Sequence, residues 1–355
     1  MVYIAIFGAL IFLNYSISPR GKVRYTTYVA TLLSLFLFSA FRFDVGCDWP
    51  GYLDQFLYPK DVWRGDGLTT LSEPLWWLII HQLRDVDAAY PWLNVVSSVI
   101  FFAGVHALAR RQPDPLAFLV VLFPVLIINM PMSGIRQAAA IGMICIALTA
   151  FMDRRLVRFV GFVAIASALH SSAIIFLVLT PFVYGQISNF RILAAGLLAI
   201  PGAIAVFNSS AATLAMARYV ESDIQSAGAI YRVALLSISG GFFLSLLRSR
   251  WRDTSPKDYK LVFVGSVAMV SLIAFVPFST VISDRVGYYF IPIQAIIFSR
   301  LPYMNLGKIQ RYYQFGIFFI LAVFLIYWTQ MSAIFAQCYI PYQSWIFGMP
   351  SFSKY

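Results

Sequence analysis

Long apolar runs, separated by short polar connectors, make up almost the whole of this 355-residue chain. A helix needs about 20 residues to cross the hydrocarbon core of a bilayer. Because twelve runs reach or approach that length, the pattern predicts an all-α, polytopic integral membrane protein with about 12 transmembrane helices in a single domain, residues 1–355. The predicted spans are 2–16, 26–42, 89–109, 115–131, 134–152, 156–169, 171–185, 191–207, 228–247, 260–279, 286–302 and 313–332.

The basic residues cluster in alternate connectors between these runs. Connectors rich in Lys and Arg mark the cytoplasmic side of a membrane protein. Under strict alternation both termini and most carboxylates then lie on the outer side. The basic clusters are Arg20, Lys22 and Arg24; Arg110 and Arg111; Arg154, Arg155 and Arg158; Arg191; Arg248, Arg250, Arg252, Lys257 and Lys260; and Arg300, Lys308 and Arg311.

The longest polar interruption, residues 42–73, is predicted to lie on the outer side. The apolar run that follows it, 74–83, is too short to cross, and with Trp76, Trp77 and His81 it predicts a short helix in the outer interface. Residues 42–88 are therefore expected to form an outer-face catalytic loop with an interfacial helix. The polar part holds six of the fifteen carboxylates: Asp44, Asp48, Asp54, Asp61, Asp66 and Glu73.

Residues 156–185 are too long for one crossing and short for two, and His170 lies at their middle. If this segment were a single helix, the large basic cluster after residue 247 would move to the outer side. We therefore predict a helical hairpin over 156–185 with His170 at its outer turn, which either crosses fully or ends within the membrane.

Composition supports a membrane protein. Hydrophobic residues make up 60% and charged residues 12% of the chain, and the mean hydropathy is +0.78, which excludes a soluble globular domain. The net charge of +11 is explained by the basic connectors and does not indicate a nucleic-acid partner. Three cysteines, Cys47, Cys145 and Cys338, are too few and too scattered to predict a disulfide framework.

Three arginines, Arg42, Arg136 and Arg285, map to the outer side, against the general trend. Charge at the edge of a span is costly, so it indicates function. Guanidinium groups bind phosphate in a bidentate manner, so a shared anion site is one interpretation. The alternatives are structural ion pairs or contacts with lipid phosphate. Arg218 and Arg232 are interpreted as loop or interface residues.

Four other polar residues are candidates for acid–base chemistry. Asp48 and Asp44 are interpreted as bases near a sugar hydroxyl, or as partners of Arg42 in a turn. Glu73 precedes a proline, so a helix cap is the alternative to a functional role. His170 is a candidate base or hydrogen-bond donor, although a single histidine is often structural. The sequence has no metal-binding motif, and a divalent cation on the carboxylates of 42–73 stays open as a weaker alternative.

These residues, in this order, resemble the EpsG family of polysaccharide polymerases, which are Wzy-like. The resemblance covers about residues 36–345, with mild departures at Cys47, where the family commonly has Thr, and at Trp49, where it has Tyr. The motifs are Arg42 with Val45, Gly46, Asp48 and Tyr52; Glu73-Pro74; Ile135-Arg136-Gln137; Ala168-Leu169-His170-Ser171-Ser172; Asp284-Arg285 with Tyr288 and Tyr289; and Ile340-Pro341-Tyr342.

The resemblance implies a polymerase of undecaprenyl-diphosphate-linked repeat units, facing the periplasm or outside from the bacterial cytoplasmic (inner) membrane. It needs neither nucleotide nor metal, because the diphosphate is the leaving group, and direct displacement at C1 would invert the anomeric centre. The partners implied are the lipid-linked donor and acceptor, a flippase and a chain-length co-polymerase. The implied roles are diphosphate binding by Arg42, Arg136 and Arg285; base or acceptor contacts by His170, Asp48 and Glu73; and sugar contacts by Asp44, Trp49, Tyr52, Trp63, Trp76, Trp77, Gln137, Tyr288 and Tyr289.

Two other classes share many of these features. A flippase for lipid-linked oligosaccharide would favour charge in a midplane cavity and symmetry between two halves. Here the charge lies toward one face and no repeat is found. A related membrane glycosyltransferase or ligase has nearly the same requirements and stays open as an alternative.

Overall fold

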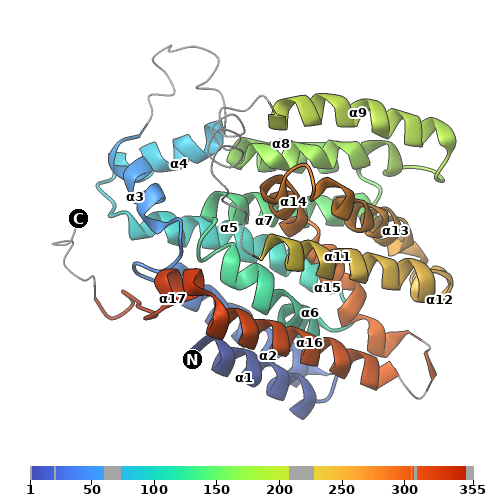
Figure 1. Cartoon of the computed structure of the whole chain (residues 1–355), viewed down its shortest axis with the longest axis horizontal. Helices are drawn as coiled ribbons and strands as arrows, with labels where there is room; N and C mark the ends of the chain where they lie inside the picture. The colour runs from blue at the N-terminus through green and yellow to red at the C-terminus, as the bar shows by residue number, and fades with distance from the viewer. Residues whose placement is uncertain are drawn as a thin grey trace.

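A computed structural model describes residues 2–19, 21–59, 73–207, 228–304, 306–307 and 310–348. Helices dominate it, as the apolar runs predict (Figure 1). The first helices are α1 (Val2–Ser16), α2 (Lys22–Ala40), α3 (Trp49–Leu57), α4 (Pro74–Asp85), α5 (Pro91–Ala109), α6 (Pro115–Leu122), the π-helical turn η2 (Phe123–Ile127), α7 (Ile135–Met152), α8 (Leu156–Leu169) and the 3₁₀ helix η3 (Ser171–Phe182).

The remaining helices follow the same pattern of apolar runs with polar ends. They are α9 (Asn189–Phe207), α11 (Ala229–Phe242), η4 (Phe243–Leu247), α12 (Arg248–Thr254), α13 (Pro256–Ser271), η5 (Leu272–Phe275), α14 (Thr280–Tyr288), α15 (Ile291–Ser299), η6 (Leu301–Tyr303), α16 (Gln310–Met331) and α17 (Ala333–Tyr339).

Six stretches of helix among the described residues are long and apolar enough to cross a membrane: 22–40, 91–109, 135–152, 229–254, 256–275 and 312–331. Shorter apolar helices lie beside them, including α1, α8 and η3. The prediction of an all-helical, multi-pass membrane protein is confirmed. The count of twelve crossings stays a prediction.

Helix α7 forms the centre of the bundle and is the most deeply buried of the long helices. It packs against α5 on one side and α8 on another. The α5–α7 contact is a contact of backbones, because a Cβ atom at Gly104 would overlap the carbonyl of Gly142, and one at Gly142 would overlap the backbone at Ile100. Small residues allow membrane helices to approach this closely.

The connectors predicted to lie on the cytoplasmic side contact one another. Arg24 forms a buried ion pair with Asp114, at 2.5 Å between Nη2 and Oδ2. Arg300 pairs with Asp258, and its Nε donates to Gln112. These contacts join four connectors that are far apart in sequence, which is the grouping that the predicted alternation requires.

The predicted outer loop contains two helices, α3 and α4. The apolar run 74–83 predicted the helix α4, but no pattern predicted α3, whose residues belong to the polar segment. Asp61, Trp63 and Asp66 lie outside the described residues. At the other end of the chain, residues 340–345 run along the start of this loop, with an isolated β-bridge between Arg42 and Ser344.

His170 separates α8 from η3, and these two helices pack against each other. Its backbone is extended, at φ −153° and ψ 118°, so the helical hydrogen-bond pattern of α8 ends there. This break places the imidazole at the turn between α8 and η3, where it contacts Glu73 at the end of the predicted outer loop.

We predict that Gly104→Ala destabilises the protein by about 3 kcal/mol, the upper end of the cost of overpacking, because the added methyl group meets backbone rather than a movable side chain. The measurement is the thermal unfolding midpoint in detergent. Gly161→Ala is the matched control, since a Cβ atom at Gly161 in α8 meets no neighbouring atom. Equal midpoints for the two variants would contradict the close α5–α7 contact.

Candidate active site

A cavity of about 560 Å³ lies among the predicted outer connectors. Its walls come from α3, the turn before α7, the start of α7, His170, α11, α14, α16 and α17. Most of these segments are distant in the sequence, so the cavity exists only in the folded chain. Its charged and strongly polar lining residues include Asp48, Arg136, Gln137, His170, Arg232, Asp284 and Arg285.

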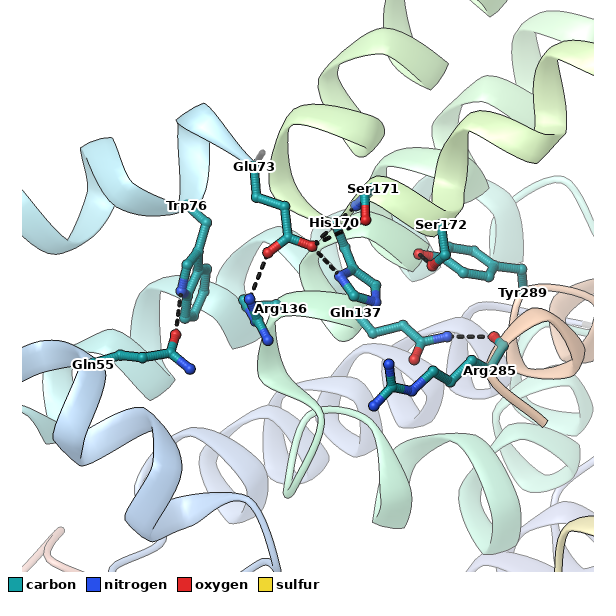
Figure 2. Close-up of polar contacts among 10 residues, drawn as sticks. All are labelled: Gln55, Glu73, Trp76, Arg136, Gln137, His170, Ser171, Ser172, Arg285 and Tyr289. Carbon is teal, nitrogen blue, oxygen red and sulfur yellow. Dashed lines mark hydrogen bonds and ion pairs between the residues drawn. The ribbon is translucent and has the colours of Figure 1, made fainter. Parts of the chain in front are cut away.

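The carboxylate of Glu73 organises one wall of this cavity (Figure 2). Its Oε2 accepts a hydrogen bond from Arg136 Nη1 at 2.5 Å, and its Oε1 lies 2.6 Å from His170 Nδ1. The Ser171 backbone N–H also donates to Oε1, at 3.1 Å. Glu73 is itself absent from the cavity lining, so it acts from behind His170 and Arg136.

The charge states of this wall follow from its geometry. Burial opposes ionisation of Glu73, but the His170 ring, the Arg136 guanidinium and the Ser171 N–H together lower its pKa to about 2. Burial lowers the pKa of His170, although Glu73 acts in the opposite direction. At neutral pH the pair is therefore a carboxylate and a neutral imidazole. Nδ1–H of His170 donates to Glu73, which leaves the Nε2 lone pair available.

The backbone of Glu73 adds a second sign of function. Glu73 caps α4 in the left-handed conformation, at φ 63° and ψ 52°. A residue with a Cβ atom pays about 1–2 kcal/mol for this conformation, and such residues are concentrated at functional sites. The ion pair with Arg136 and the bonds to His170 and Ser171 hold it in place.

Arg136 and Arg285 bring positive charge to the cavity in different ways. Arg136 is already paired with Glu73, and its Cζ atom lies 5.5 Å from the centre of the Tyr52 ring. Arg285 is exposed. Within the part of the chain that the structure describes, no hydrogen bond or ion pair of its guanidinium is found. The Arg285 carbonyl accepts from Gln137 Nε2 at 2.5 Å, which fixes the position of α14 beside α7.

Arg232 also lines the cavity, which the sequence interpretation as a loop or interface residue did not anticipate. Its Nε and Nη2 donate to Asp284 at 2.7 and 2.6 Å. The Arg232 Cζ atom lies 5.5 Å from the centre of the Tyr288 ring. This pair links α11 to α14 on the wall that also carries Arg285.

Asp48 lies across the cavity, in the loop before α3. Its Oδ2 accepts a hydrogen bond from the Ser133 hydroxyl at 3.1 Å, and its backbone N–H donates to Ser133 Oγ at 3.2 Å. Its side chain is exposed to the cavity. Asp48 is therefore a carboxylate acceptor that lines the cavity from the loop before α3.

Arg42 does not reach the cavity, although it was predicted to bind diphosphate with Arg136 and Arg285. It is 1% exposed. Its guanidinium donates to the carbonyls of Ser39 and Val45 and to Asn94 Oδ1, at 2.8–2.9 Å. These bonds show that Arg42 anchors the loop. The sequence could not show this, because the position of a residue at the end of an apolar run does not determine the direction of its side chain.

The predicted sugar-contact residues divide in the same way. Tyr52, Gln137 and Tyr288 line the cavity. Five others do not. Trp49 of α3 and Trp76 of α4 are buried in an aromatic cluster, Tyr289 is buried beside Ser172, and Asp44 is exposed outside the cavity. Trp77 is buried with the first two, and Trp63 lies outside the described residues.

Sequence reasoning missed several lining residues. The only sequence signal for Ser133 is its position two residues before the Ile135-Arg136-Gln137 motif. Trp328, Phe335 and Tyr339 come from the carboxyl-terminal helices, where no polar pattern marked a site. The sequence predicted no disulfide framework and did not indicate the single disulfide bond between Cys47 and Cys338, which are separated by 291 residues.

Among the described residues, no three His, Cys, Asp or Glu side chains gather closely enough to hold a metal ion. The expectation of a reaction without cofactor stays a prediction.

The fold and the cavity define a multi-pass helical membrane protein with a charged, histidine-containing site at one end of its helices. Comparison with protein-family models matches residues 25–344 to the EpsG family, and the chain belongs to this family. Membership points to an exopolysaccharide-related polymerase with glycosyltransferase-like activity. No curated protein and no solved structure matches the chain.

We predict that His170 titrates below the usual histidine pKa of about 6.5, and that Glu73→Gln lowers its pKa further, because the carboxylate that favours the imidazolium is removed. The measurement is an NMR titration of the protein labelled with ¹³C-histidine. The chain has three histidines, so the spectrum contains few resonances. His170→Asn assigns the resonance. A higher pKa in Glu73→Gln would contradict the proposed pairing.

Proposed function

We propose that this protein polymerises undecaprenyl-diphosphate-linked oligosaccharide repeat units on the outer face of the bacterial cytoplasmic membrane. The observation that carries the proposal is the Glu73–His170 pair, which shares a cavity with the Arg285 guanidinium. A base and a cation in one cavity suit a reaction in which a hydroxyl attacks and an anion departs. Family membership supports the same reaction class.

His170 acts as the general base in this proposal. Its Nε2 takes the proton of the acceptor hydroxyl while that oxygen forms a bond to C1 of the donor sugar. Glu73 holds the imidazole in the tautomer with Nδ1 protonated and stabilises the imidazolium that forms, as the carboxylate does in Ser-His-Asp triads. Glu73 is fully engaged by its own partners, so it serves neither as the base nor as an acceptor-sugar ligand.

The bond that breaks joins C1 to the diphosphate oxygen. Negative charge develops on that oxygen, and in this proposal Arg285 binds it together with Arg136. The proposal is supported by the presence of both side chains in the cavity lining. Because Arg136 already neutralises Glu73, Arg285 contributes most of the attraction for the leaving group. Direct displacement inverts the configuration at C1.

The other cavity residues are assigned to sugar recognition. Asp48 accepts hydrogen bonds from sugar hydroxyls, and the Gln137 side chain adds an amide contact. Tyr52 and Tyr288 supply aromatic faces at two sides of the cavity. The donor carries its own leaving group, so this reaction takes neither a nucleotide sugar nor a metal ion. A flippase and a chain-length co-polymerase are the partners we propose for it.

We expect the purified protein to form lipid-linked multimers from undecaprenyl-diphosphate-linked repeat units of its own host, without nucleotide sugar or added metal. His170→Gln should lower the rate by about 10²–10⁴-fold, because it removes the general base. Arg285→Gln should lower it by about 10²–10³-fold, because it removes a charge that stabilises the leaving group. Multimers are separated by gel electrophoresis and counted from a radiolabelled sugar.

Arg111→Gln is the matched arginine control, since Arg111 pairs with Asp153 in a half-exposed connector remote from the cavity. Its rate should equal that of the wild type. Loss of activity in Arg111→Gln alone, or an unchanged rate in both cavity variants, would overturn the assignment of the site. Movement of the lipid across a proteoliposome membrane without multimers would favour a flippase instead.

A further inference from the structure

The disulfide bond between Cys47 and Cys338 joins the two ends of the chain at the edge of the cavity. Cys47 is exposed and lines the cavity. The residue that follows each cysteine, Asp48 and Tyr339, also lines the cavity. The bond therefore connects two segments of the cavity wall that are separated by 291 residues.

Backbone hydrogen bonds continue this connection on both sides of the disulfide. The Gly46 N–H donates to the Cys338 carbonyl at 2.7 Å, and the Phe43 N–H donates to the Gln343 carbonyl at 2.9 Å. The Trp345 N–H donates to the Phe41 carbonyl at 2.9 Å. Residues 338–345 thus form a strap along the loop 41–47, and we call them the carboxyl-terminal strap.

The strap carries the helix that closes one side of the cavity. Ile334, Phe335 and Tyr339 of α17 line the cavity, as do Trp328 and Ser332 just before it. α17 has seven residues, and the helix it mainly contacts is α16, which directly precedes it in the chain. Tyr3 of α1 also contacts it, because its hydroxyl donates to the Tyr339 carbonyl at 3.0 Å and its ring packs on Phe335. The strap adds a third attachment, and the disulfide is its covalent part.

Cys145 does not compete for this pairing. It lies in α7, at the centre of the bundle, and is fully buried. Of the three cysteines of the chain, Cys47 and Cys338 can therefore pair only with each other in the folded protein. A pair of this kind needs oxidation but no later rearrangement.

We propose that the Cys47–Cys338 pair is a substrate for a thiol–disulfide oxidoreductase on the outer side of the membrane, and that its oxidation completes the cavity wall. In the first step a Cys thiolate of the pair attacks the disulfide of the oxidoreductase and forms a mixed disulfide. The second thiolate then displaces the reduced enzyme. Two thiols lose two protons and two electrons, and the oxidoreductase disulfide becomes a dithiol.

The compartment follows from the same chemistry. Structural disulfides persist in oxidising compartments and are rare where glutathione and thioredoxin act. The cavity then faces the outer side, by an argument independent of the Lys and Arg distribution. The inference is also independent of the proposed polymerase activity, because it concerns only the two thiols and the strap.

The first test counts thiols in the full-length protein. Cells are quenched with acid, and the denatured protein is treated with maleimide-polyethylene glycol. We expect one adduct, at Cys145, and three adducts after reduction. Treating intact spheroplasts with a membrane-impermeant phosphine should also give three. Three adducts without reductant would overturn the proposal, as would a pair that the impermeant phosphine reduces only after permeabilisation.

The same count in a strain without the outer-face thiol oxidoreductase should give three adducts before reduction. A pair that is fully oxidised in that strain would show that no such enzyme is required, and this result would overturn the assigned partner.

The second test measures hydrogen exchange in residues 333–345 by mass spectrometry. We expect faster exchange in the reduced wild type and in the double variant Cys47→Ser/Cys338→Ser, with unchanged exchange in α5 and α7. Cys145→Ser is the matched control and should behave as the wild type under both conditions. Equal exchange in the oxidised and reduced proteins would overturn the role of the disulfide in holding the cavity wall.

Discussion

The cavity depends on one buried anion, the Glu73 carboxylate. Burial alone disfavours this charge, so the structure must supply donors from other segments. They come from Arg136 at the start of α7 and from His170 and Ser171 at the break between α8 and η3. Satisfying this carboxylate therefore fixes the amino-terminal end of α4 against both α7 and the α8–η3 break. The same bonds set the tautomer of the imidazole, so the requirement for burial and the chemistry of the site are met by one arrangement.

The rest of the fold separates its polar contacts into two groups, with apolar helix between them. Arg24 with Asp114 and Arg300 with Asp258 belong to the group made by the basic connectors. The Glu73 contacts belong to the other. In lipid, polar groups must be satisfied within the protein, so each connector pairs with connectors at its own end. Distant segments of the chain are therefore brought together at both ends of the helices. The contacts of Glu73 belong to the end that forms the cavity.

The sequence alone could predict the helices, because apolar runs of sufficient length determine them. It also singled out Glu73, Arg136, His170 and Arg285, because ionisable groups among such runs are costly, and the structure gathers these residues at one cavity. The sequence could not predict the direction in which each side chain points. Arg42 and Arg136 have similar positions at the ends of apolar runs, yet one anchors a loop and the other faces a cavity. Periodicity also could not show α3, which is short and lies in a polar segment, or contacts such as Arg232 with Asp284, which depend on how α11 and α14 pack.

The backbone contact between α5 and α7 divides the cavity into a fixed side and an adjustable side. At Gly104 and Gly142 no side chains are available to repack, so α7 cannot slide along α5 without separating from it. Arg136 and, through Glu73, His170 are attached to this fixed frame. Arg285 lies on α14, whose neighbours are α11, η5 and η3. The frame reaches α14 through the hydrogen bond from Gln137 to the Arg285 carbonyl. A change in the width of the cavity at α14 must therefore lengthen that bond, while the bonds that hold the imidazole can stay as they are.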